Sequence, residues 1–113
     1  MSITDVKMGP ALAATGSTDA VLMSGQPFSV QAFGTTTAGA GTATVIVEGS
    51  NHASPSLDGH WVTLATLSLS FTTAVGSDAG GSVLPYLNVR ARVSAISGTG
   101  ASISFQMAKG KSA

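Results

Sequence analysis

Apolar and polar residues alternate with a period of two in most runs of this chain that lie between clusters of Gly and small polar residues. In the first clear run, Phe28, Val30 and Ala32 fall on one side of an extended chain, and Ser29 and Gln31 fall on the other. Such alternation is typical of a β-strand with one buried face and one solvated face. The pattern therefore predicts a strand here.

The same pattern recurs along the chain. In the run TATVIVEG, the side with Ala43, Val45 and Val47 opposes the side with Thr44, Ile46 and Glu48. Further strands are predicted over 61–71, 86–96 and 101–107, with shorter ones over 3–8 and 20–23. A helical turn is indicated only at 11–14, between Pro10 and Gly16.

The run 61–71 changes character along its length. One side carries Trp61, Leu67, Leu69 and Phe71, whereas the other side is apolar at Val62 and Leu64 and polar afterwards. A strand buried on both faces at one end, or a β-bulge, would produce this change. Because Trp61 shares its side with the apolar residues, we expect it to be buried in the core.

The run 86–96 carries the densest group of functional side chains. Its inward side is predicted to hold Leu87, Val89, Ala91, Val93 and Ala95, and its outward side Tyr86, Asn88, Arg90, Arg92 and Ser94. Tyr and Arg are enriched at protein interfaces. We therefore take Tyr86, Asn88, Arg90 and Arg92 as interface candidates. The alternatives are a merely solvated face, or internal pairing of the arginines with Glu48 or Asp58.

Clusters of Gly, Ser, Thr and Asp separate the runs and predict turns. The residues SGTG at 97–100 indicate a hairpin. The Gly-rich stretches 34–42 and 76–82 are predicted to be flexible surface loops. Neither stretch has the Lys-Ser/Thr ending or the following helix of a phosphate-binding loop.

Together these signals predict an all-β fold. About seven or eight strands with frequent turns are typical of an antiparallel β-sandwich, here jelly-roll-like. The 113 residues suit one domain, 1–113, in which residues 1–24 form an N-terminal arm plus the first strands.

The charge content narrows the range of partners. Only 9% of the residues are charged, and five basic residues balance five acidic ones. This balance argues against partners that are nucleic acids or anionic membranes. A surface with few charges also does little to keep subunits apart, and unprotected strand edges recruit partners. We therefore expect a homo-oligomer, with a trimer favoured.

Candidate chemistry is sparse. The chain has no Cys, so a disulfide framework and a thiolate zinc site are excluded. In the sequence, His52 and His60 lie near Glu48, Ser54 and Asp58. Residues of these types could form a metal site or a Ser-His-Asp group. No motif such as GxSxG supports a nucleophile. We expect solvated loop residues, no catalytic residue, no cofactor and no metal, and hence no enzyme.

Targeting signals are also missing from the sequence pattern. An acid at Asp5, with no basic run before an apolar stretch, does not resemble a signal peptide. No stretch approaches the ~18 apolar residues of a spanning helix. We expect a protein made in the cytoplasm, without a membrane partner.

Three segments, read together, carry a resemblance: VIVEGSN at 45–51, WVTLATLSLS at 61–70 and YLNVRARVSAISGTGAS at 86–102. The chain resembles small β-sandwich virion proteins of tailed bacteriophages, in particular capsid decoration or cementing proteins, over roughly residues 28–108. The resemblance implies a structural protein of the virion, made in the host cytoplasm. It would sit on the outer capsid, often as a homotrimer, and bind the major capsid protein.

Two other function classes stay open. One is a carbohydrate- or receptor-binding β-sandwich module of a phage tail or an adhesin, which a glycan array would reveal. The other is a hydrolase that uses His52 or His60, which metal analysis and an activity comparison of H52A and H60A would reveal. Fold class alone does not decide between these functions.

Overall fold

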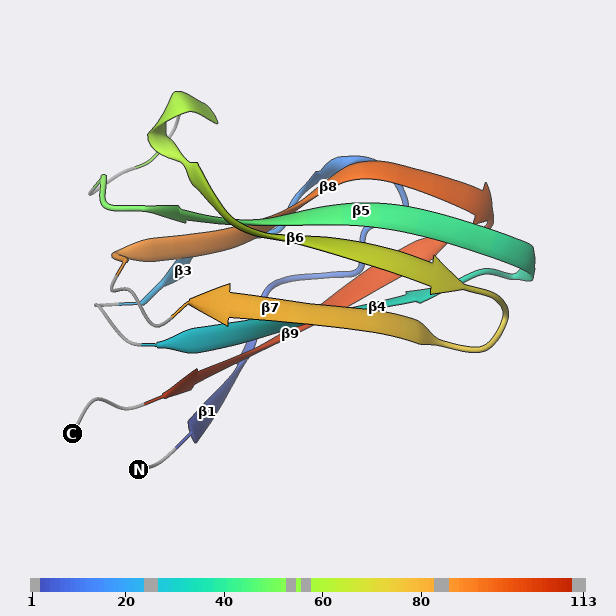
Figure 1. The fold of residues 1–113 in the computed structure, drawn as a ribbon, viewed down its shortest axis with the longest axis horizontal. Coiled ribbons are helices and arrows are strands. Elements are labelled where there is room, and N and C mark those ends of the chain that lie inside the picture. The colour runs from blue at the N-terminus through green and yellow to red at the C-terminus, as the bar shows by residue number, and fades with distance from the viewer. Residues whose placement is uncertain (1–2, 24–26, 53–54, 56–57, 83–85, 111–113) are drawn as a thin grey trace.

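The computed structural model describes residues 3–23, 27–52, 55, 58–82 and 86–110, and nearly all of its regular structure is β (Figure 1). The elements in chain order are β1 (Ile3–Lys7), β2 (Gly16–Ser17), β3 (Val21–Leu22), β4 (Phe28–Thr35), β5 (Ala38–Ser50), the 3-10 turn η1 (Asp58–His60), β6 (Val62–Phe71), β7 (Gly76–Ser82), β8 (Asn88–Thr99) and β9 (Ser102–Gly110). The hairpin predicted at SGTG joins β8 to β9, and Ala101 N–H donates to the Gly98 carbonyl in its turn.

The strands form two antiparallel sheets. Sheet A has the order β1-β9-β4-β7, and sheet B has the order β2-β8-β5-β6, with β3 also paired to β8. Hence early strands pair with late ones in a nested series: β1 with β9, β2 and β3 with β8, β4 with β7, and β5 with β6. This nested pairing is that of a jelly roll, in which β2 and β3 share one strand position. The predicted fold class is confirmed.

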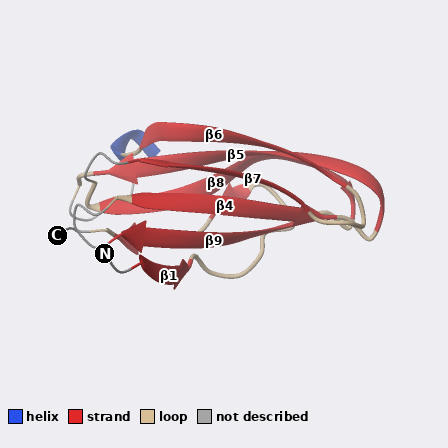
Figure 2. Ribbon diagram, turned by 60° about the horizontal axis from the view of Figure 1, so that its bottom comes forward, coloured by secondary structure: helices blue, strands red, loops and turns tan. Residues whose placement is uncertain are grey.

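The two sheets pack face to face, with their strands along the long axis of a flattened molecule of 44 × 33 × 20 Å (Figure 2). The core between them holds the predicted inward side chains of β4 (Phe28, Val30 and Ala32), with Val45, Val47, Leu67, Leu69, Val89, Ala91, Val93, Ile103, Phe105 and Met107 from the other strands. Met8 and Met23, which lie outside the strands, are fully buried against the same core. The described residues contain no helix long and apolar enough to cross a membrane.

Residues 11–14 do not form the predicted helical turn. Leu12 instead makes an antiparallel bridge to Ile103, in which the backbone N of each residue lies 2.8 Å from the carbonyl O of the other. Leu12 also packs against the core. Burial of Leu12 and satisfaction of its backbone groups therefore outweigh the weak helical preference of an Ala-rich stretch.

The Gly-rich stretches were wrongly predicted to be loops. Residues 76–82 form the edge strand β7, paired with β4 over its full length, and β5 already begins at Ala38. The glycines of β7 allow a close approach to β6, because a Cβ on Gly80 would lie 2.9 Å from Ala65 Cβ. The Asp78 carboxylate accepts from the Ser68 N–H of β6 at 3.0 Å. This contact links the neighbouring edges of the two sheets.

The inward positions predicted for side chains of β8 are confirmed in the middle of the strand and wrong near its ends. Val89, Ala91 and Val93 are buried, as predicted. The register with β5 shifts between Thr44 and Val45, which is a bulge. Beyond it Ala95 is exposed, and Ile96 packs against the core instead. At the other end Leu87 is exposed, so its predicted inward position is also wrong.

Candidate interface on the outer face of sheet B

A bulge in the β5–β6 pairing shapes the outer face of sheet B. The register shifts at Val47/Glu48, so that Val47 pairs with Ala65 whereas Glu48 pairs with Thr63, and Leu64 is the extra residue. A residue inserted in this way reverses the facing of all side chains beyond it. Thr63 is therefore exposed beside Glu48, although Leu67 and Leu69 of the same strand point into the core.

Trp61 lies beyond this bulge, on the outer side. It is buried, as predicted, but it is not part of the apolar core that Leu67, Leu69 and Phe71 form. The Arg90 guanidinium covers its ring, with the guanidinium carbon 4.5 Å from the ring centroid. The prediction that Trp61 shares a face with the core residues is therefore wrong. The apolar Val62 and Leu64, which fall out of phase in the sequence, were the signal for the bulge.

Glu48 joins the two arginines of the predicted outward stripe. Its Oε1 accepts from Arg90 Nε at 2.9 Å and from Arg92 Nε at 3.4 Å. Register explains this cluster, because Glu48 pairs directly with Arg90 on β8. The Glu48 side chain is only 8% exposed and that of Arg90 14%, whereas that of Arg92 is 36% exposed. Internal pairing with Glu48, one of the alternatives left open, is observed.

Both guanidinium groups contact the same oxygen of the Glu48 carboxylate. Among the described residues, the side chain of Arg92 donates its hydrogen bond through Nε, and 36% of the side chain is exposed to solvent. Ile46 lies directly opposite Arg92 on β5 and is half-buried on this outer face. A half-buried aliphatic side chain beside an accessible guanidinium can pack against a protein surface and bind a carboxylate in it.

Hydroxyl groups surround Ile46 and Arg92. Thr66 pairs with Ile46 from β6, Ser17 pairs with Arg92 from β2, and Thr44 lies two residues before Ile46 on β5. We call the group of Thr44, Ile46, Thr66, Arg92 and Ser17 the arginine face. It has the small, polar and weakly charged character of an interface rim around an apolar and cationic centre.

The other two interface candidates lie elsewhere. Asn88 is buried, and its Nδ2 donates to the His52 carbonyl at 3.1 Å, which ties β8 to the loop after β5. Tyr86 packs against the core, with its ring over Gly49. Arg92 is therefore the predicted candidate with the greatest side-chain exposure on this face.

The two histidines come together beyond β5. The rings of His52 and His60 stack with centroids 4.1 Å apart and planes 8° from parallel. Within the described part of the chain, no group of three His, Asp or Glu residues could hold a metal ion. The stack connects the loop after β5 to η1, the turn that precedes Trp61.

No protein-family model matches the chain, and no curated protein matches it in sequence. Its fold does match a solved structure, the crystal structure of the SPBc2 prophage-derived protein YomS, with a TM-score of 0.57. The match covers 96% of this chain and 94% of the YomS chain, at 10% sequence identity. The two chains therefore share one fold over nearly their full lengths.

Proposed function

We propose that this chain is a structural virion protein of a tailed bacteriophage that decorates or cements the capsid. It is made in the host cytoplasm and assembles as a homotrimer on the outer capsid surface. There it binds the major capsid protein through the arginine face, and it turns over no substrate. The arginine face carries this proposal, because it offers an accessible, preorganised cation on a rigid sheet.

The contact of Arg92 with Glu48 supports its role in binding. Its Nε is held by Glu48, and Glu48 is held in turn by Arg90. An arginine whose orientation is already fixed loses less conformational entropy when it binds a carboxylate. A capsid shell repeats one surface many times, so a modest contact repeated across a trimer gives strong attachment through avidity.

The fold and its structural neighbour support the phage assignment. YomS derives from a prophage, and it shares the architecture of this chain over nearly its full length. The sequence resemblance to phage decoration proteins runs through three of the four strands that build the arginine face, β5, β6 and β8. Both lines support a phage protein, which is the coarser part of the proposal.

Co-sedimentation with empty capsid shells of the phage that encodes this chain tests the proposal. We expect the wild-type protein to pellet with the shells and Arg92→Glu to bind at least about tenfold more weakly, a loss of about 1.4 kcal/mol. Lys109→Glu is the matched control, because it makes the same charge change on β9 of sheet A and should bind as the wild type does.

Two readouts complete this test. Circular dichroism should show that Arg92→Glu and Lys109→Glu both stay folded. For Arg92→Glu we expect this because the side chain of Arg92 is more exposed than that of Arg90. Light scattering should give the wild-type protein about three times the chain mass of 11.1 kDa. If Arg92→Glu bound the shells as tightly as the wild type does, the arginine face would not be part of the contact. A wild-type protein that does not pellet with the shells would contradict the decoration role.

A further inference from the structure

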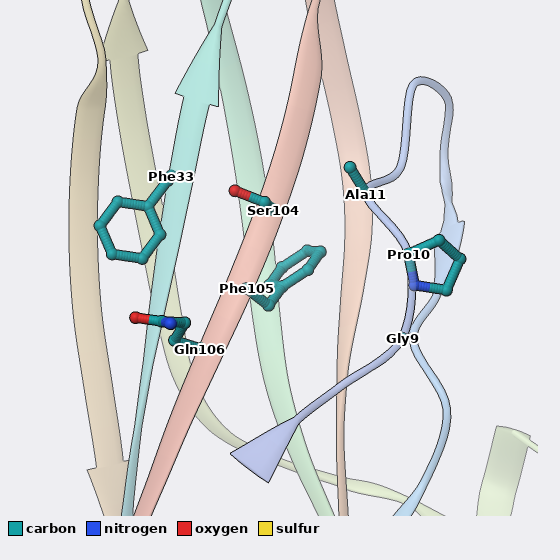
Figure 3. A pocket seen from close by; sticks show the side chains of 7 residues that line it. All are labelled: Gly9, Pro10, Ala11, Phe33, Ser104, Phe105 and Gln106. Carbon is teal, nitrogen blue, oxygen red and sulfur yellow. The ribbon is translucent and has the colours of Figure 1, made fainter. Parts of the chain in front are cut away.

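A second feature lies on the outer face of sheet A, on the opposite side of the sandwich from the arginine face. A hollow of about 340 Å³ crosses β9 there, lined by Gly9, Pro10, Ala11, Phe33, Ser104, Phe105 and Gln106 (Figure 3). Its volume lies at the low end of the range of ~300–1,000 Å³ for small-molecule sites. We call this hollow the β9 trough.

The two walls of the trough come from distant parts of the chain. Phe33 projects from β4 on one side of β9, and Gly9, Pro10 and Ala11 lie on the other side (Figure 3). The bridge between Leu12 and Ile103 fixes the loop that carries the second wall. The walls are therefore held by the fold and not by a free loop.

The outward side chains of β4 and β9 supply hydrogen-bonding groups. Phe33 pairs with Ser104 across the two strands, and Gln31 pairs with Gln106. Gln31 Nε2 also donates to Ser77 Oγ of β7 at 3.3 Å. A carboxamide can donate and accept at once, which suits a ligand whose hydroxyl groups do the same.

The Asp19 carboxylate lies next to Gly9 at one wall of the trough, whereas the outward side chains of β4, β7 and β9 around it are uncharged. They are Ser29, Gln31, Phe33 and Thr35 on β4, Ser77 and Ala79 on β7, and Ser102, Ser104, Gln106 and Ala108 on β9. Recognition of a phosphate or a carboxylate normally uses a cation or a cluster of directed N–H groups. The described lining therefore favours a neutral ligand.

The position of the trough argues against a peptide strand as the ligand. An added strand needs an open sheet edge, with free backbone N–H and C=O groups. The trough crosses β9, which is paired with β4 on one side and, on the other, with β1 as far as Gln106 and with Leu12 at Ile103, so that only Ser104 and Phe105 lie at an open edge, too few for an added strand. A ligand there meets the half-buried ring of Phe33, the amide of Gln106 and the hydroxyl of Ser104.

We infer that the β9 trough binds a neutral saccharide. A pyranose ring presents C–H bonds on its flat faces and hydroxyl groups around its rim. The C–H face stacks on Phe33, and the hydroxyl groups exchange hydrogen bonds with Gln106 and Ser104. This inference goes beyond the proposed capsid role and does not use the arginine face, so either one can fail without the other.

The test is a glycan array printed with neutral and acidic saccharides, followed by titration of the best neutral ligand against the labelled protein by NMR. We expect binding to neutral saccharides, with amide shift changes centred on Phe33, Ser104 and Gln106. Phe33→Ala should weaken binding about tenfold or more, because the stacking ring is lost. Phe33→Tyr keeps a ring and should bind within about threefold of wild type.

Ser29→Ala is the matched control. Ser29 is exposed on the same face of β4, about 13 Å along the strand from Phe33, so its loss should leave affinity unchanged. If Phe33→Ala does not fold, Gln106→Ala replaces it and should also weaken binding. Three results would overturn the inference: no neutral saccharide bound at millimolar concentration, a preference for acidic saccharides, or shift changes away from the trough.

Discussion

Glu48 is the residue on which the arginine face depends. A single oxygen of its nearly buried carboxylate accepts from both Arg90 and Arg92. Removal of the carboxylate would leave Arg90, itself mostly buried, without this compensating charge. Loss of one partner from a buried ion pair is far more costly than loss of a solvent-exposed pair.

We therefore expect Glu48→Ala to lower the free energy of unfolding by about 3 kcal/mol. Urea denaturation measures the change, with Thr66→Ala as the control, because Thr66 is exposed on the same face. The control should change stability by no more than about 0.5 kcal/mol. If Glu48→Ala changed stability as little as the control does, the ion pairs would not contribute to holding β5 and β8 together.

Trp61 reports on the same cluster. It is the only tryptophan of the chain, so its emission is that of one site. Arg90 covers the ring, and the indole is only 8% exposed. Arg90→Ala should uncover it, which would shift its emission to longer wavelength and increase quenching by iodide. Arg92→Ala should leave the emission nearly unchanged, and an equal shift in both variants would contradict the stacking of Arg90 on Trp61.

At the scale of elements, β7 shows why glycine can be required in a strand. Glycine normally weakens a strand, because it adds no side-chain packing and loses much backbone freedom on folding. In β7 the glycines let the strand lie close to its neighbours: a Cβ on Gly76 would collide with the Ser70 carbonyl oxygen of β6. The close approach of β6 and β7 therefore requires this residue to be small.

Gly76→Ala should destabilise the fold by about 1–3 kcal/mol, in the range of other overpacking substitutions. Gly59→Ala is the matched control, since a Cβ there would meet nothing within 4 Å. Thermal unfolding of the two variants measures the difference. A Gly76→Ala protein as stable as Gly59→Ala would show that β6 and β7 are not packed this closely.

Much of this architecture could be predicted from the period of the sequence, because β4 and β9 each have one apolar face. Several of the failures have one of two physical causes. Each bulge inserts one residue and reverses the faces beyond it, which misplaced Trp61 and Ala95. Strand β7 has too few apolar residues to show any period, and its pairing with β4 is set by tertiary contact.

The candidate site was predictable only in part. The period placed Arg90 and Arg92 on one outward stripe, and Glu48 was among their possible partners. The period of the sequence could not show that Asn88 lies beneath the loop after β5 or that Tyr86 packs over Gly49. Both contacts depend on chain segments that are distant in sequence. Phe33 shares the outward side of β4 with Ser29 and Gln31, but an aromatic residue within an alternating run gives no separate signal.

At the scale of the whole molecule, the jelly roll separates two surfaces. The arginine face lies on the outside of sheet B, and the β9 trough lies on the outside of sheet A. A subunit that attaches through sheet B would present sheet A away from the shell. The proposed attachment and the inferred saccharide site are therefore compatible in one particle, although neither requires the other.

Cryo-electron microscopy of the phage particles, with and without the gene for this chain, tests the central claim most directly. We expect extra density on the outer shell at symmetry axes, in clusters of three jelly rolls whose sheet B faces the capsid. Particles without the gene should lack this density. Identical shells in the two preparations, or density confined to the tail, would contradict the account.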